Sequence, residues 1–286
     1  MRTLYFDCFS GISGDMVIGA LIDAGADPVQ MEEELKKLNI DEEYTLSWGK
    51  VVKNGITSTK FDVILTSKSE QPHEHSHSDE HEHSHGHEHN HNDEHGHSHG
   101  HVHENNHNHV HHHHHGSRTY KQIVEAINEA NFNESVTNWS LAIFKKIGEA
   151  EGHIHGLPLE KVHFHEVGAV DSIIDIIGAA ILIDQLGIES VQSSAIPTGS
   201  GHIHIDHGIY PVPAPATLEI LKGVPIASND IRFELTTPTG AAIAAVLAEK
   251  FGLLPAMTVE SIGYGAGTKT FENHPNVLRI IIGEIQ

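Results

Sequence analysis

A histidine-rich tract at residues 69–117 constrains this chain more than any other feature, because the rest of the sequence must fold around it. The tract holds 21 of the chain's 29 histidines and nine acidic residues, and it contains no Lys or Arg. It has almost no apolar side chains, so it cannot bury enough surface to offset the entropy lost on ordering. We therefore expect a disordered insertion between residues 1–68, an N-terminal α/β segment, and residues 118–286, the helical and α/β remainder of the same domain.

The density of histidine predicts that this tract binds metal ions. Imidazole suits Ni(II), Cu(II) and Zn(II), and binding should weaken as the pH falls through about 6.5, where histidine takes up a proton. The alternatives are a solubilising linker or a purification tag at His111 to His115, although a tag rarely lies inside a longer irregular run. The tract does not indicate which metal it binds.

The charge of the chain excludes some classes of partner. The nine acids of the tract account for −9 of the net charge of −22, which leaves −13 for the other 237 residues. We expect neither nucleic acid nor an anionic membrane as a partner, because both are bound through an excess of Lys and Arg. No apolar run reaches the ~20 residues of a membrane span. The single cysteine, Cys8, cannot form an internal disulfide, and we expect a cytoplasmic protein.

The rest of the sequence alternates between strand and helix patterns, which predicts a mixed α+β sheet with flanking helices, within the α/β class. Asn54-Gly55 is a strong hairpin signal between strand patterns at 44–52 and 56–65. Further strands are expected at 3–9, 191–196, 257–262 and 276–282, and helices at 134–151 and 241–250, with others beginning near Met16, Pro28, Thr119 and Asp171. We interpret Gly263 to Gly267 as a turn. Gly152 to Gly156 is interpreted as a polar loop or as a contribution to a metal site.

The stretch from His163 to Asp175 has the outline of a metal site. His163 and His165 point the same way in an extended segment, and Glu166 follows them. Asp171 and Asp175 are four residues apart, so they share one face of a helix. Nitrogen and oxygen ligands suit nickel, zinc or manganese, whereas a site for magnesium alone would have little use for imidazole. Alternatively, the aspartates favour the positive helix end and the histidines are surface residues.

A second group of candidate ligands follows a glycine-rich loop at residues 198–201. His202 and His204 alternate on one face of a predicted strand, and Asp206 and His207 lie just beyond it. The loop suggests a phosphate or carboxylate close to a metal ion. The alternative is a solvated edge strand with polar side chains facing outward.

Two glycine-rich loops at helix N-termini predict a phosphate site, because backbone N–H groups there bind anions. The candidate residues are Ser10, Gly11, Ser13 and Gly14 in the first loop and Thr237, Thr239 and Gly240 in the second. Asp15 would repel a phosphate unless a metal ion lay between them, so Asp7 and Asp15 are candidate metal ligands. The alternatives are a tight turn with Ser13 as the helix cap and ordinary capping at the second loop.

Six ordered blocks resemble the LarC-type nickel insertion proteins. They are FDCFSGISGDM from Phe6, HFHEVGAVDSIIDIIGA from His163, GSGHIHIDHG from Gly199, PVPAPATLEILKG from Pro211, ELTTPTGAA from Glu234, and GYGAGT with PNVLRIIIGE near the end. The resemblance implies a nickel chelatase or insertase of the lyase class. Such proteins insert Ni(II) into pyridinium-3,5-bisthiocarboxylic acid mononucleotide by a CTP-dependent cyclometallation that needs Mn(II) or Mg(II), and the product is the nickel-pincer cofactor of lactate racemase.

The same resemblance implies partners. Family members commonly continue past residue 286 into a C-terminal region associated with CTP, and in some members a programmed frameshift separates the two parts. This chain resembles the N-terminal, metal-delivering part, active together with the C-terminal LarC part, with the lactate racemase apoprotein as a further partner. We also expect a homo-oligomer. The tract would gather nickel, and the two glycine-rich loops would hold the substrate phosphate. The site that receives nickel would be drawn from His163, His165, Glu166, Asp171, His202, His204 and His207. The alternatives are a nickel storage protein or metallochaperone without catalysis, and a metal-dependent nucleotide hydrolase.

Overall fold

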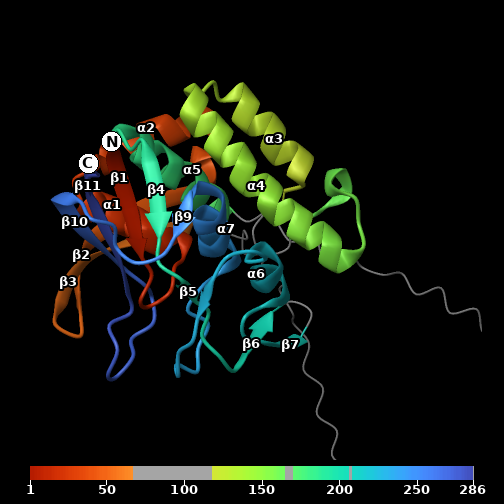
Figure 1. The fold of residues 1–286 in the computed structure, drawn as a ribbon. Coiled ribbons are helices and arrows are strands. Elements are labelled where there is room, and N and C mark those ends of the chain that lie inside the picture. The colour runs from red at the N-terminus through yellow and green to blue at the C-terminus, as the bar shows by residue number, and fades with distance from the viewer. Residues whose placement is uncertain (67–117, 165–169, 206–207, 286) are drawn as a thin grey trace, which may run out of the picture. The chain divides into compact units, whose positions relative to one another are not determined.

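The computed structural model describes residues 1–66, 118–164, 170–205 and 208–285, and these segments belong to one compact unit. Figure 1 shows a sheet with helices packed on it, which confirms the predicted mixed α+β class. The histidine-rich tract lies outside the described residues. Among the helices of the described segments, none has both the length and the apolar character that a membrane span requires.

Seven strands form one mixed sheet in the order β2-β3-β10-β11-β1-β4-β9. They are β1 (Arg2–Asp7), β2 (Tyr44–Lys53), β3 (Ile56–Leu65), β4 (Ser190–Ser193), β9 (Lys250–Phe251), β10 (Thr258–Ala266) and β11 (Val277–Glu284). Strand β1 pairs antiparallel with β11 and parallel with β4. Two small sheets lie beside it: β5 (Ile196–Pro197) pairs with β8 (Ile226–Ala227), and β6 (His202–Ile205) pairs with β7 (Gly208–Pro211).

The helices pack on the buried apolar side chains of this sheet. They are α1 (Gly14–Asp23), α2 (Pro28–Leu35), α3 (Tyr120–Glu129), α4 (Glu134–His155), α5 (Val170–Gln185), α6 (Pro215–Ile220) and α7 (Pro238–Leu247), with 3₁₀ turns at Lys36–Leu38, Asp41–Glu43 and Leu159–Lys161. Helix α1 contacts β3, β10 and α5, and α4 packs on α5, α6 and α7. Alternate residues of β1 and β11, such as Leu4, Phe6 and Ile280, join α1 and α5 in the core, as the period of two in a strand requires.

Several boundaries follow from local chemistry. Asn54 and Gly55 have φ values of 46° and 84°, which fit the tight turn between β2 and β3. Thr119 and Gln122 form a capping box at the start of α3. Asn133 caps α4 at its first turn, and Gly156 ends that helix in the left-handed conformation. The predicted hairpin and the predicted start of α3 are therefore confirmed.

The structure corrects three predictions. Residues 263–267 were expected to form a turn, but β10 continues through Ala266, and its glycines let α1 approach closely. The polar loop predicted at residues 152–156 is wrong, because α4 continues to His155. The helix predicted at residues 241–250 begins earlier, at Pro238, and ends at Leu247. Pro at the first helical position needs no N–H partner, which explains the early start.

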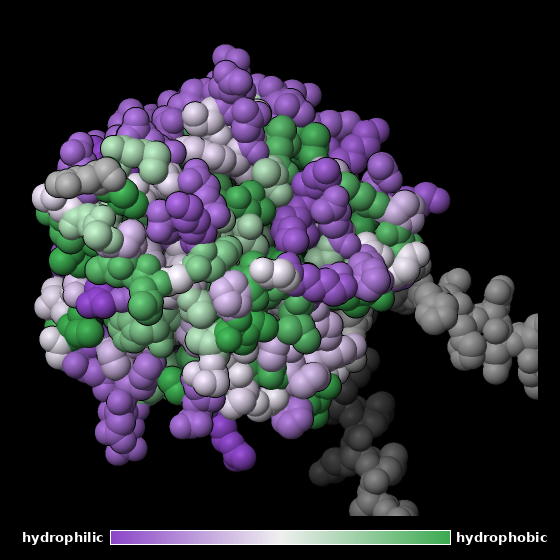
Figure 2. Space-filling model, viewed as in Figure 1, coloured by the Kyte–Doolittle hydropathy of each residue, from purple (hydrophilic) through white to green (hydrophobic). Residues whose placement is uncertain are grey.

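The surface of the molecule is mixed in polarity. Figure 2 shows hydrophilic side chains along the upper rim, over α2 and α3, and again at the lower tips, with apolar side chains scattered over the rest of this face. The most exposed large apolar side chain of the described residues is Leu253, at 93%. Single exposed apolar side chains are normal in folded proteins, so they do not by themselves mark a site.

Candidate functional site

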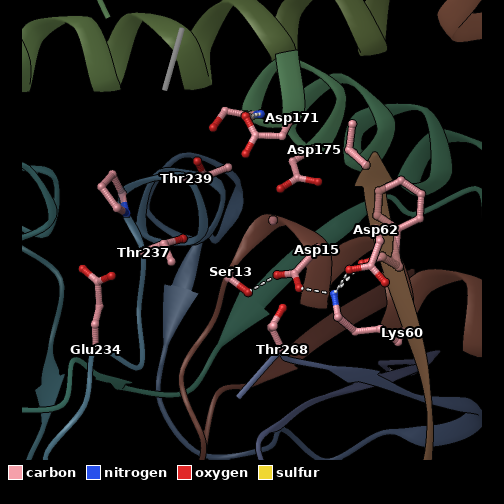
Figure 3. A pocket seen from close by; sticks show the side chains of 15 residues that line it. Ser13, Asp15, Lys60, Asp62, Asp171, Asp175, Glu234, Thr237, Thr239 and Thr268 are labelled. Atoms are coloured by element: carbon pink, nitrogen blue, oxygen red, sulfur yellow. Dashed lines mark hydrogen bonds and ion pairs between the residues drawn. The ribbon is translucent and has the colours of Figure 1, made fainter. Parts of the chain in front are cut away.

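Three helices begin at one cavity of about 390 Å³. Asp15 lies at the start of α1, Asp171 in the first turn of α5, and Thr237 and Pro238 at the start of α7. Strand β3 supplies another wall (Figure 3). A helix N-terminus carries unpaired backbone N–H groups and the positive end of the helix dipole, so it favours anions. Three such ends make the cavity suited to a phosphate or carboxylate group.

Backbone hydrogen bonds hold two distant loops together beside this cavity. The Ile12 N–H donates to the Leu235 carbonyl at 3.1 Å, and the Thr237 N–H donates to the Ile12 carbonyl at 3.2 Å. Gly11 has a φ of 92°, and a Cβ there would overlap the Leu235 carbonyl. A Cβ on Gly240 would overlap the Ile12 carbonyl. The glycines therefore allow the N-termini of α1 and α7 to meet.

The carboxylate of Asp175 lies in the wall of the cavity and points toward Asp15 (Figure 3). It packs directly on Gly14, where any Cβ would overlap it. Its Oδ1 atom is buried and has no hydrogen-bond partner among the described residues. Burial raises the pKa of Asp175 well above its ordinary value, and the negative charges of Asp15 and Asp171 raise it further. The unpaired oxygen can accept a cation or a proton.

Lys60 supplies positive charge to this group of acids. Its side chain on β3 is 15% exposed, and its Nζ lies 2.8 Å from the Asp15 carboxylate and 2.8 Å from that of Asp62. Burial alone would lower the pKa of Lys60, but the two aspartates more than offset this effect and raise it. The Ser13 hydroxyl also donates a hydrogen bond to Asp15. Lys60 therefore remains a charged donor inside the cavity.

The lining of the cavity carries more acids than bases. In the described part of the chain its acidic residues are Asp15, Asp62, Asp171, Asp175 and Glu234, and its basic residue is Lys60. Hydroxyl groups are contributed by Ser13, Ser172, Thr237, Thr239 and Thr268. The carboxylates would repel a lone phosphate, whereas the helix ends attract it. Both features fit a phosphate that binds together with a divalent cation, because such a cation bridges carboxylate and phosphate oxygens.

The predicted phosphate residues fall into two groups. Four of them line the cavity: Ser13, Gly14, Thr237 and Thr239. Ser10, Gly11 and Gly240 do not line it and instead fix the loops. The Ser10 hydroxyl donates to the Pro275 carbonyl at 2.7 Å and lies 2.6 Å from His274 Nε2. The two predicted glycine-rich loops are thus adjacent, which is compatible with the predicted phosphate site.

The predicted metal ligands are dispersed. Asp15, Asp171 and Asp175 line the cavity, whereas Asp7 forms an ion pair with Arg279. His163 is exposed and forms a bridge with Thr119, and His202 and His204 are exposed on the β6–β7 hairpin. His165, Glu166, Asp206 and His207 lie outside the described residues. Within the described segments, no group of three or more His, Cys, Asp or Glu side chains is arranged to hold a metal ion.

Five polar lining residues were not predicted: Lys60, Asp62, Ser172, Glu234 and Thr268. Lys60 and Asp62 alternate along β3, so they share a face of that strand, but the sequence does not indicate what that face meets. Glu234 and Thr268 lie at the ends of predicted motifs without a residue type that singles them out. Their roles depend on which strands are neighbours in the sheet.

Comparison with known proteins identifies relatives along nearly the whole chain. The family model described as "Nickel insertion protein" matches residues 4–286. Relatives named pyridinium-3,5-bisthiocarboxylic acid mononucleotide nickel insertion protein occur in Geobacillus kaustophilus, 48% identical over 99% of this chain and 60% of the relative, and in Clostridium acetobutylicum, 48% identical over 99% of this chain and 64% of the relative. A relative of that name in Staphylococcus epidermidis is 46% identical over 98% of this chain and 59% of the relative.

The chain spans about 60% of the length of these relatives. No solved protein structure matches it significantly.

Proposed function

This chain belongs to the nickel insertion protein family, and on that premise we propose that it takes part in inserting Ni(II) into pyridinium-3,5-bisthiocarboxylic acid mononucleotide. The observation that carries the proposal is the cavity in which three helix N-termini meet an excess of carboxylates. A mononucleotide has a single phosphate, which suits the helix ends. It lacks the many phosphates of a nucleic acid, which an acidic protein repels.

The substrate phosphate binds at the N-termini of α1 and α7. The hydroxyls of Thr237 and Thr239 lie at the start of α7 and line the cavity. Thr237 Oγ1 already accepts from the Gly240 N–H at 3.2 Å, and its own proton is available to a phosphate oxygen. Lys60 adds positive charge from the opposite wall. Its three N–H groups contact Asp15, Asp62 and the Phe61 carbonyl, which hold it in position before the substrate arrives.

A divalent cation, Mn(II) or Mg(II), fits the same cavity. The fit rests on the carboxylate of Asp175, which points toward Asp15 (Figure 3) and whose buried Oδ1 has no partner among the described residues. Two carboxylates and a substrate phosphate are the usual ligands of Mg(II) in proteins, and this set needs no third protein ligand. Asp15 and Asp175 would hold the ion, with Asp171 close by. The ion would neutralise the charge between these carboxylates and the phosphate.

Nickel is the second substrate. The histidine-rich tract gathers Ni(II). The ion then passes toward the nucleotide through the predicted ligands His163, His165, Glu166, His202, His204 and His207. Geometry and ligand softness rather than raw affinity decide which site holds the ion, so the sulfur donors of the substrate can draw nickel from imidazole. Replacing His163 and His165 together with Ala should abolish nickel transfer. Cofactor formation at the wild-type rate by that double variant would exclude this route.

The complete reaction involves more than this chain. Because the chain spans about 60% of its relatives, we propose that it is the N-terminal, metal-delivering part of a CTP-dependent cyclometallase of the lyase class, with CTP bound by a C-terminal region. The product would mature the lactate racemase apoprotein. The buried thiol of Cys8, whose pKa is raised by burial to about 12, is inert and fits a reducing compartment such as the cytoplasm.

The test is nickel transfer to the bisthiocarboxylate mononucleotide with CTP and Mn(II), followed by absorbance and mass, in the presence and absence of the C-terminal region. Lys60→Gln removes a buried charge-assisted donor and should lower the rate about tenfold or more. Lys50→Gln is the matched control, because Lys50 is a more exposed lysine on β2 that pairs with Asp23. Equal rates for the two variants would show that the cavity takes no part in nickel transfer.

The histidine-rich tract favours a second candidate, a nickel storage protein or metallochaperone without catalysis. With 21 histidines the tract alone accounts for extensive nickel binding. Deleting residues 69–117 separates the two functions. A storage protein should lose most of its nickel capacity and should form no nickelated product with or without the tract. An insertase supplied with excess nickel should still form nickelated product without it.

A further inference from the structure

Four aromatic rings form a continuous surface beside the cavity, which we call the aromatic platform: Phe9, Phe233, Phe271 and His274. The centroids of Phe9 and His274 are 6.1 Å apart, those of His274 and Phe271 are 6.3 Å apart, and those of Phe271 and Phe233 are 5.5 Å apart. Phe9 is 39% exposed, and the other three rings are partly exposed. The contacts are tilted or edge-on, so the rings do not cover one another completely.

Two cations lie on this platform. Lys269 Nζ is 5.6 Å from the Phe233 ring centroid, and Arg279 Cζ is 6.0 Å from that of Phe9. Arg279 is fixed by its ion pair with Asp7, whereas Lys269 is exposed. Both cations lie on the same group of rings, although the chain has a net charge of −22. The combination suits a planar ligand that carries negative substituents.

The platform adjoins the cavity through two segments of the chain. Phe233 precedes Glu234, and Lys269 follows Thr268, and both Glu234 and Thr268 line the cavity. Consecutive Cα atoms are about 3.8 Å apart, so these platform residues begin one step from the cavity wall. In Figure 3, Glu234 and Thr268 lie on either side of Ser13 at the lower edge of the cavity, opposite Asp171 and Asp175.

The loops that carry the platform are fixed by hydrogen bonds. Ser10 is fully buried and its hydroxyl donates to the Pro275 carbonyl, so His274 Nε2 donates to Ser10 at 2.6 Å. Lys53 Nζ donates to the carbonyls of Thr268 and Lys269 at 3.2 and 3.1 Å. A surface held in this way needs little reordering when a ligand binds.

We propose that the aromatic platform binds the pyridinium ring of the mononucleotide while the phosphate occupies the cavity. The proposal rests on the proposed function and adds to it the place and orientation of the reacting ring. The cationic ring stacks on Phe9 and its neighbours, and the two anionic thiocarboxylates pair with Lys269 and Arg279. Glu234 lies between the cavity and the aromatic platform, at the level of the ribose. A carboxylate commonly accepts hydrogen bonds from ribose hydroxyls. The ring thus lies at the exposed edge, where a nickel donor has access.

Three probes of increasing size test this orientation by calorimetry on the full chain: ribose 5-phosphate, an unsubstituted pyridinium mononucleotide, and pyridinium-3,5-dicarboxylic acid mononucleotide. The wild-type chain should bind them with increasing affinity. Phe9→Ala should weaken both pyridinium probes about tenfold, as loss of one stacking ring does, and should leave ribose 5-phosphate unchanged. Phe9→Trp should restore binding of the pyridinium probes.

Lys269→Gln should weaken only the dicarboxylic acid probe, because it removes charge and leaves the rings in place. Leu253→Ala is the control for loss of an exposed apolar side chain, and it should bind all three probes like the wild type. If Phe9→Ala and Lys269→Gln bind all three probes like the wild type, the platform is not the ring site, although the cavity still holds the phosphate. If none of the probes binds to the wild type, the cavity assignment and the ring assignment both fail.

Discussion

At the scale of one residue, Asp175 is an acid whose charge costs stability. Its carboxylate is buried, one oxygen lacks a partner among the described residues, and Asp15 and Asp171 add negative charge nearby. Each of these features disfavours the ionised form. Gly14 is required beneath it, since a Cβ there would overlap the carboxylate. A structural role alone would be served better by a neutral side chain, so the acid is expected to act on a ligand.

Asp175→Asn should therefore stabilise the chain at neutral pH. Below about pH 3.9 the aspartate is protonated in both the folded and unfolded states, and the variant and wild type should be equally stable. As the pH rises, only the folded state keeps the proton, because its pKa is raised, so the wild type loses stability. Each unit by which the pKa is raised costs about 1.4 kcal/mol. Thermal unfolding at pH 3 and pH 7 measures the difference.

Mn(II) should raise the unfolding temperature of the wild type and not that of Asp175→Asn. Asp62→Asn is the matched control, because Asp62 lines the same cavity with a side chain that is 50% exposed, and it should shift little at either pH. A variant Asp175→Asn that is less stable than the wild type at pH 7 and equally responsive to Mn(II) would contradict both the burial penalty and the cation site.

At the scale of elements, local chemistry predicted the hairpin, the capped helices and the class of fold. It failed where a pattern depends on a distant neighbour. Residues 263–267 have the composition of a turn, but Gly263 and Gly265 lie in β10, where α1 approaches so closely that a Cβ would overlap the carbonyls of Ala20 and Met16. A glycine that makes room for another element cannot be distinguished, from sequence alone, from a glycine that turns the chain.

The contact between the N-terminus of α7 and the loop before α1 gives an element-scale prediction. A Cβ on Gly240 would overlap the Ile12 carbonyl, and the backbone on neither side can move without breaking the bonds between Ile12, Leu235 and Thr237. Gly240→Ala should lower the free energy of unfolding by about 1–3 kcal/mol, measured by urea denaturation. It should also weaken binding of ribose 5-phosphate, because the two helix ends separate.

Gly49→Ala is the control for that substitution. Gly49 lies in β2 with open space around it, so an added methyl group there should leave the stability within about 0.5 kcal/mol of the wild type. If Gly240→Ala is as stable as Gly49→Ala and binds ribose 5-phosphate normally, the close approach of α7 to the loop has no part in forming the site.

At the scale of the whole molecule, the cavity gathers residues from segments that are far apart in the chain. The sequence predicted Asp15 and Thr237 because each lies near a helix start that local signals mark, and it predicted Asp175 because of its spacing of four from Asp171. Lys60 was missed, because its place depends on the parallel pairing of β3 with β10, which no local pattern encodes. A strand shows which residues share a face, whereas the sheet order decides what that face meets.

The histidine-rich tract gives the last prediction, because we expect it to add metal capacity to a domain whose described residues hold no preformed cluster of three ligands. The full chain should bind many nickel ions at pH 7.5, and most should be released as the pH falls through about 6.5, since imidazole must be neutral to bind a metal. A chain without residues 69–117 should bind few ions and show unchanged thermal unfolding without metal, because the tract has little apolar surface to contribute to a core. Equilibrium dialysis across pH 5 to 8 measures the number of nickel ions bound by each chain.

Equal amounts of nickel bound by the full and the shortened chain would instead assign the capacity to the folded part. Release at pH values well below 6 would point to carboxylate ligands in place of imidazole.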